Sequence, residues 1–171
     1  MAEVFKEYLI KQKKSPKDVC MQVGLIAGAI ILAIIMIVLR LRFIGPLAIV
    51  IVVFGAGYLF TKFNREYEYI LTNNELDIDV IYNRSSRKRV MTINMRKIDI
   101  MASIKDERHM NELNRPGIKV INASDNTNES NTYAIITKSE KDGVCKVLIT
   151  LNDTLLDDLY RQAPTKIFKY K

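Results

Sequence analysis

The class of this protein is decided by two apolar runs, VCMQVGLIAGAIILAIIMIVL at residues 19–39 and FIGPLAIVIVVFGAGYLFT at residues 43–61. Neither run contains Asp, Glu, Lys or Arg, and each has about the 20 residues that a helix needs to cross a hydrocarbon core. A signal peptide has a shorter apolar region followed by a cleavage site. Two core helices that are apolar on every face would need more protein around them than the chain provides. The sequence therefore predicts a transmembrane helical hairpin over residues 16–61.

Lys and Arg residues near the ends of the two runs predict the orientation of this hairpin. The positive-inside rule counts these residues close to each span. More of them flank the outer ends of the two runs than lie in the short connector. We therefore expect a multi-pass protein of the cell membrane with both termini in the cytoplasm. The flanking residues are Lys6, Lys11, Lys13, Lys14, Lys17, Lys62 and Arg65, and the connector carries Arg40 and Arg42.

Glycines occur at similar predicted depth in both runs, at Gly24 and Gly28 in the first and at Gly55 and Gly57 in the second. Small residues allow membrane helices to approach closely. These four residues are therefore candidate helix-packing sites, either between the two helices of one hairpin or, through the G-x-x-x-G spacing, between two copies. Neither run carries the ionisable groups that are typical of transport pathways.

The segment before the first run is basic and has apolar residues at helical spacing. We expect residues 1–15 to form a basic amphipathic helix on the membrane surface, with Lys11, Lys13 and Lys14 as candidate lipid-binding residues. Each lysine near an anionic surface contributes about 1 kcal/mol. The alternative is an ordinary basic flank that only determines topology.

Residues 62–171 have the pattern of a small β domain. Apolar and polar residues alternate with period two along several short stretches, and turn residues separate them. Helical spacing returns only after Asn152, where Leu155, Leu156 and Leu159 form one apolar face that ends before Pro164. The predicted strands are residues 66–72, 76–83, 89–95, 99–105, 118–123, 132–138 and 144–151.

The expected fold class is thus an α+β membrane protein. A two-helix transmembrane hairpin is followed by a small antiparallel β-barrel of about seven strands, which the C-terminal helix caps.

Two segments of this domain, EYEYILTNNELDIDV at residues 66–80 and VMTINMRKIDIMASI at residues 90–104, resemble the bacterial pleckstrin-homology (PH) membrane proteins. The whole chain is also similar to a bacterial family of two-span membrane proteins. The resemblance implies a cytoplasmic PH-like interaction domain and no particular activity. The residues that match are Tyr69, Leu71, Thr72, Leu76, Ile93, Lys97 and Ile98.

Eukaryotic relatives of this family often hold phosphoinositides with basic residues of the first hairpin loop, which here is the uncharged pair Asn73-Asn74. The basic residues of this chain are in the second loop instead. The first predicted strand starts near the membrane and the second returns toward it, so this second loop lies close to the bilayer. We predict that it binds anionic lipid headgroups, the alternative being a solvated turn. Its candidate residues are Arg84, Arg87, Lys88 and Arg89.

The sequence does not indicate catalysis or the binding of a ligand other than lipid or protein. The sequence contains none of the common nucleotide-binding, hydrolase or zinc motifs, and Asp77 and Asp79 are expected on the outer face of a β-hairpin. Residues 62–171 carry a net charge of only +3 of the total +7, so a nucleic-acid partner is not indicated. We expect no enzyme activity, cofactor, metal site or small-molecule substrate.

Two functions fit these expectations. The first is a membrane-anchored interaction module whose PH-like domain binds a protein partner or anionic lipid headgroups. The second is a subunit of an oligomeric membrane assembly, such as a pore or an envelope-stress complex, with a second copy of the chain as partner.

Overall fold

The computed structural model describes residues 5–39, 44–127, 129, 131–139 and 143–170. The chain divides into two compact units, one formed by residues 14–65 and one by residues 1–13 together with residues 66–171. The first is a helical hairpin and the second is a β domain. The predicted connector residues Arg40 and Arg42 lie outside the described residues.

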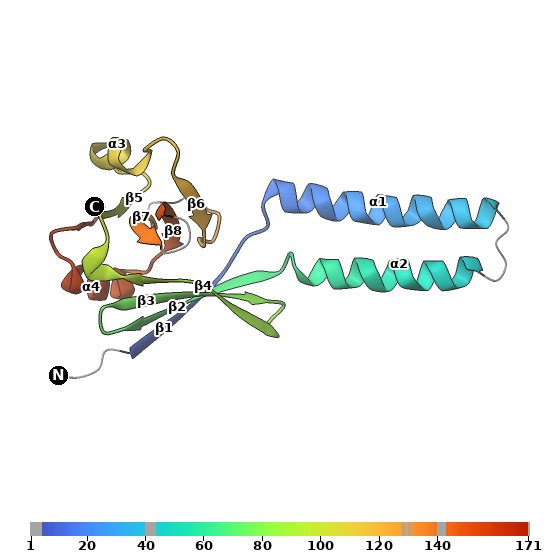
Figure 1. Cartoon of the computed structure of the whole chain (residues 1–171), viewed down its shortest axis with the longest axis horizontal. Helices are drawn as coiled ribbons and strands as arrows, with labels where there is room; N and C mark the ends of the chain where they lie inside the picture. Colours follow the sequence, from blue (N-terminus) through green and yellow to red (C-terminus); the bar gives the residue numbers. More distant parts are fainter. Residues whose placement is uncertain (1–4, 40–43, 128, 130, 140–142, 171) are drawn as a thin grey trace. The chain divides into compact units, whose positions relative to one another are not determined.

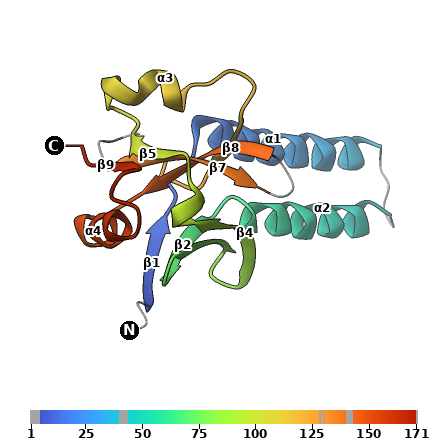
Figure 2. The same ribbon diagram turned by 60° about the vertical axis from the view of Figure 1, so that its left-hand side comes forward.

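The hairpin unit consists of helices α1 (Pro16–Val38) and α2 (Ile44–Thr61), which lie side by side and antiparallel (Figures 1 and 2). Helix α1 begins as the sequence predicts, because Pro16 occupies the first turn and the Ser15 backbone N–H donates to the Asp18 carboxylate at 3.1 Å. It has 23 residues and no buried side chain, and it is long and apolar enough to cross a membrane. Helix α2 is apolar but shorter, with 18 residues or about 27 Å of length.

The β domain contains two sheets. The first has the strand order β1-β2-β3-β4, and the second has the order β6-β8-β7-β5-β9 with parallel pairing of β6 to β8 and of β5 to β9. The strands of the first sheet are β1 (Phe5–Lys11), β2 (Arg65–Thr72), β3 (Glu75–Tyr82) and β4 (Ser86–Asn94). Those of the second are β5 (Ile100–Ser103), β6 (Lys119–Asn122), β7 (Thr132–Ser139), β8 (Gly143–Thr150) and β9 (Ile167–Phe168).

A C-terminal helix, α4 (Asp153–Gln162), and a short helix, α3 (Met110–Leu113), complete the domain. The Asn152 side chain caps α4 by accepting from the Leu155 backbone N–H at 2.8 Å. The sequence predicts this helix. One hydrophobic core joins the inner faces of the two sheets to α4. Its fully buried members include Tyr69, Leu71, Leu76, Ile78, Ile93, Ile135, Val147, Ile149 and Leu159.

The prediction of an amphipathic helix over residues 1–15 is wrong. Residues Phe5–Lys11 form strand β1, which pairs antiparallel with β2 along seven residues. Tyr8 and Ile10 pack against the core, whereas Glu7, Leu9 and Lys11 are exposed. This alternation has the period of a strand, and the partner that stabilises it lies about 60 residues away along the chain.

The domain boundary also differs from the one that the sequence predicts near residue 62. Residues 1–13 belong to the β domain, so the helical hairpin is an insertion between the first two strands of the first sheet. It does not precede a self-contained domain.

The predicted β-barrel is not closed. All seven predicted strands are present, and β1 and β9 are additional. Among the described residues, however, no strand pairing joins an edge of the first sheet to an edge of the second. The core between the two sheets and the cover provided by α4 bury the apolar faces without closure.

Candidate functional site

The turn between β3 and β4 has an unusual backbone. Asn83 and Arg84 both have positive φ angles, of 48° and 57°, which is the pattern of a type I′ turn, and the loop between the paired residues Tyr82 and Ser86 has three residues. Asparagine tolerates this region, but a long side chain such as arginine normally avoids it. Strained positions of this kind occur preferentially at functional sites. The Arg84 side chain is 77% exposed, and its Nε donates to a carboxylate oxygen of Glu66 at 3.3 Å.

Arg87 and Arg89 have a different environment, because they lie in strand β4 and not in the turn. Arg87 contacts the carboxylate of Glu68 across the sheet, and its Nε is 4.0 Å from Asp79. Arg89 contacts Asp79 and is 2.7 Å from Asp77. A register shift in β3 between Ile78 and Asp79 places Asp79 opposite Arg89. We call this outer face of the first sheet the charge lattice, and it consists of Glu66, Glu68, Asp77, Asp79, Arg84, Arg87 and Arg89.

The burial of its carboxylates indicates that the charge lattice stabilises the first sheet. The Asp79 carboxylate is only 4% exposed, and a buried carboxylate requires an ionic partner. The hydrogen bond to Asp79 raises the pKa of Arg89 above its ordinary value. Four carboxylates face three guanidinium groups in this lattice, and the close pairs balance the charges of Arg87 and Arg89 locally. Asp77 and Asp79 lie on the outer face, as the sequence predicts, and they hold strands together.

The four basic residues of the second loop predicted to bind lipid therefore have two different environments. Arg87 and Arg89 are engaged by carboxylates of neighbouring strands. Arg84, with one loose ion pair, and the exposed Lys88 present their charge outward. Lipid binding by these residues stays a prediction.

Lys11 lies at the same end of the first sheet. It is exposed at the end of β1 directly opposite Glu66, the residue that also contacts Arg84. Strand β3 ends and β4 begins at this end, and the chain leaves β1 here for α1 and returns from α2 into β2. The topology thus brings Lys11, Arg84 and Lys88 to the end of the sheet from which the hairpin is inserted.

The two other predicted lipid-binding residues do not join them. The Lys13 backbone N–H donates to the Asp125 carbonyl oxygen at 2.9 Å, and the Asn126 side chain donates to the Lys13 carbonyl oxygen at 2.8 Å. Lys14 belongs to the hairpin unit, where its Nζ is 3.3 Å from the Gln22 side-chain oxygen. Both side chains are exposed.

Sequence patterns did not reveal the polar network that anchors residues 12 and 13. The Gln12 side chain donates to the Ser124 carbonyl oxygen at 3.1 Å. Asp125 accepts hydrogen bonds from the backbone and hydroxyl groups of Thr127 and from the Thr150 hydroxyl. Burial raises the pKa of the Asp125 carboxyl, but these hydrogen bonds outweigh it and hold the pKa below its usual value.

Tyr69 connects this network to the core. Its hydroxyl donates to the Ala123 carbonyl oxygen at 2.7 Å and accepts from the Thr150 backbone N–H at 3.2 Å. The side chain is fully buried, and burial raises its pKa well above the ordinary value of tyrosine. Tyr69 on β2 thus links the first sheet to β8 of the second.

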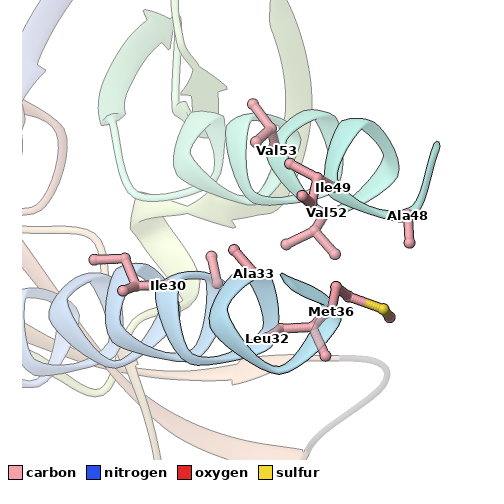
Figure 3. A pocket seen from close by; sticks show the side chains of 9 residues that line it. Ile30, Leu32, Ala33, Met36, Ala48, Ile49, Val52 and Val53 are labelled. Atoms are coloured by element: carbon pink, nitrogen blue, oxygen red, sulfur yellow. The ribbon is translucent and has the colours of Figure 1, made fainter. Parts of the chain in front are cut away.

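Three of the four glycines predicted to pack helices line a groove between α1 and α2. This groove has a volume of about 460 Å³, and Gly24, Gly28 and Gly55 are among its lining residues. A methyl group added at any of these positions, or at Gly57, would meet no atom within 4 Å. A second space of about 200 Å³, lined by side chains such as Met36 and Val52, also lies between the two helices (Figure 3). The glycines therefore face open space and not a tight helix contact.

Within the described part of the chain, no group of three His, Cys, Asp or Glu side chains is placed to hold a metal ion. The chemistry that the arrangement can provide is ionic attraction at the turn and apolar contact along the hairpin.

A family model described as "Bacterial PH-like domain" (DUF6106) matches residues 2–169. The match includes strand β1 and the inserted hairpin as well as the following strands. Comparisons with curated proteins and with solved structures found no match.

Proposed function

The chain belongs to this bacterial PH-like domain family, and from that premise we propose that it is a membrane-anchored interaction module. Its hairpin inserts into the cell membrane, and its PH-like domain binds anionic lipid headgroups of that membrane through Lys11, Arg84 and Lys88. The observation that carries this proposal is that these three residues share the sheet end from which the membrane hairpin is inserted.

The pairing of β1 with β2 supports two membrane crossings. Lys11, before the hairpin, lies opposite Glu66, after it, so both ends of the insertion are on the same side of any membrane. If α1 crosses the bilayer, α2 must cross back. Its length of about 27 Å is close to the thickness of a hydrocarbon core of about 30 Å. The basic residues at the outer ends of the spans favour a cytoplasmic location of the domain.

The charge lattice limits which residues contribute to lipid binding. Arg87 and Arg89 form ion pairs with carboxylates of the same sheet. Exposed basic residues near an anionic surface each contribute about 1 kcal/mol before screening. Binding by Lys11, Arg84 and Lys88 is therefore weak per residue, and it depends on the hairpin to hold the domain near the membrane.

The test uses the full chain in lipid nanodiscs with an environment-sensitive fluorophore on Ser85→Cys, in a Cys20→Ser background. We expect the emission to shift to shorter wavelength when phosphatidylcholine is replaced by phosphatidylglycerol, and the shift to decrease with added salt. The double variant Arg84→Gly/Lys88→Ser should lose most of the shift. Glycine suits the positive φ of position 84, so this variant keeps the turn.

The matched control is Arg96→Ser/Lys97→Ser, which removes the same charge just beyond the opposite end of β4. This control should keep the shift. Emission that is independent of lipid composition would contradict lipid binding and favour a protein partner. An equal loss of the shift in both double variants would show that the shift depends only on the net charge of the domain.

A further inference from the structure

The connectivity of the chain divides the molecule into an arm and a body. Strand β1 continues into α1, whereas α2 continues into β2 and the rest of the β domain. We call residues 5–38 the N-terminal arm. Only five residues, 39–43, connect this arm to α2.

The β1 part of the arm is held by few side chains. It pairs with β2 along seven residues, but only Tyr8 and Ile10 of its described side chains pack against the core. Leu9 is 55% exposed, and Lys6 forms an ion pair with Asp158 of α4 at the surface. Main-chain hydrogen bonds to a strand edge can be supplied by any chain with the same strand.

The α1 part of the arm is held loosely as well. The groove of about 460 Å³ at its glycines lies between α1 and α2, and none of the described α1 side chains is buried. Small residues in membrane helices are typical of surfaces that contact another helix. Within one hairpin α2 does not approach these glycines closely, because a Cβ added at Gly24 or Gly28 would meet no atom within 4 Å.

We propose that two copies of the chain exchange their N-terminal arms. In the exchanged dimer, β1 pairs with β2 of the partner in the register seen within one chain, and α1 packs against the partner's α2. Every contact of the arm is retained, and the arm takes the place of the partner's own arm, so the orientation of both hairpins in the membrane is unchanged. A short connector between two packed elements favours such exchange, and the additional helices are available to fill the glycine groove.

The test is disulfide cross-linking between two differently tagged full-length chains that are co-expressed and oxidised in isolated membranes. Both chains carry Cys20→Ser, while Cys145 stays because it is buried. One chain carries Glu7→Cys and the other Ile70→Cys, two positions that face each other in the β1–β2 register. We expect a disulfide-linked dimer that contains both tags.

The matched control replaces Glu7→Cys by Lys11→Cys. Lys11 is on the same face of β1 but four residues out of register with Ile70, which is about 13 Å along a strand and beyond the reach of a disulfide. The control should lose the linked dimer. A further chain carries both Glu7→Cys and Ile70→Cys.

Each other outcome overturns the proposal. If the doubly substituted chain forms its disulfide only within one chain and the singly substituted pair forms none, the arms are not exchanged. If the control cross-links as well as the register pair, the dimer arises from random collision. If no variant cross-links, β1 does not pair with β2 in this register.

Discussion

Tyr69 connects the two sheets through a single hydroxyl group, which donates to the Ala123 carbonyl oxygen and accepts from the Thr150 backbone N–H. Both backbone partners lie beside the loop that holds residues 12 and 13. The hydroxyl therefore stabilises the loop that holds residues 12 and 13 of the arm as well as the core. A buried backbone group that loses its partner costs the full desolvation penalty.

We predict that Tyr69→Phe lowers the free energy of unfolding by about 1–3 kcal/mol, because it leaves the Ala123 carbonyl and the Thr150 N–H unpaired. Chemical denaturation of the full chain in detergent micelles, followed by circular dichroism, measures the change. Tyr160→Phe on the exposed face of α4 is the control and should change stability by less than about 0.5 kcal/mol. Equal effects of the two substitutions would show that the Tyr69 hydroxyl is not important.

For the charged residues of the first sheet, the sequence predicts the face on which they lie but not the partners with which they pair. Period-two alternation places Asp77 and Asp79 on the outer face, and the structure confirms it. The partners of these carboxylates are not predictable from the sequence, because they depend on a one-residue register shift at Ile78/Asp79 and on the pairing of β3 with β4. The sequence pattern consequently assigns Arg87 and Arg89 to the second loop, whereas they lie in β4 among carboxylates.

At the scale of elements, the sequence predicts those helices and hairpins that interactions between neighbouring residues determine. The β2–β3 hairpin, the capped start of α1 and helix α4 follow from neighbouring residues. Strand β1 does not, since seven residues with mixed periodicity are compatible with a helix until β2 becomes available. The open edges of the two sheets, where a barrel was expected, are likewise set by long-range packing.

The cap of α4 provides the prediction for this scale. Asn152→Ala removes the acceptor of the Leu155 N–H and should destabilise the domain by about 1 kcal/mol. Asn152→Asp keeps an acceptor at the same position and should restore most of that loss. Thermal unfolding of the full chain in micelles is the measurement. If alanine and aspartate have the same effect, the side chain does not act as a cap.

For the whole molecule, the insertion of the hairpin means that the β domain is assembled from two separate parts of the sequence. Lys11 and Glu66 are direct partners, so a two-residue Asn-Gly turn can replace residues 12–65. We predict that this joined chain is more stable in urea than a fragment of residues 66–171, by about 2 kcal/mol from the half-buried Tyr8 and Ile10.

A joined chain with Tyr8→Ser and Ile10→Ser is the control, and it should lose most of this gain. Equal stability of the joined chain and the fragment would mean that β1 is dispensable and that the domain is complete from residue 66. The comparison needs no membrane, because the two apolar helices are absent from all three proteins.

Because the hairpin is inserted between β1 and β2, the order of synthesis affects folding. When β1 leaves the ribosome, its partner does not yet exist, and the two apolar helices must be made before β2. At roughly 5–20 residues per second, the approximately 60 residues from Lys11 to the end of β2 require about 3–12 s. During that interval β1 is an unpaired strand, and under the proposed membrane anchoring the hairpin would reach the bilayer before the first sheet is complete.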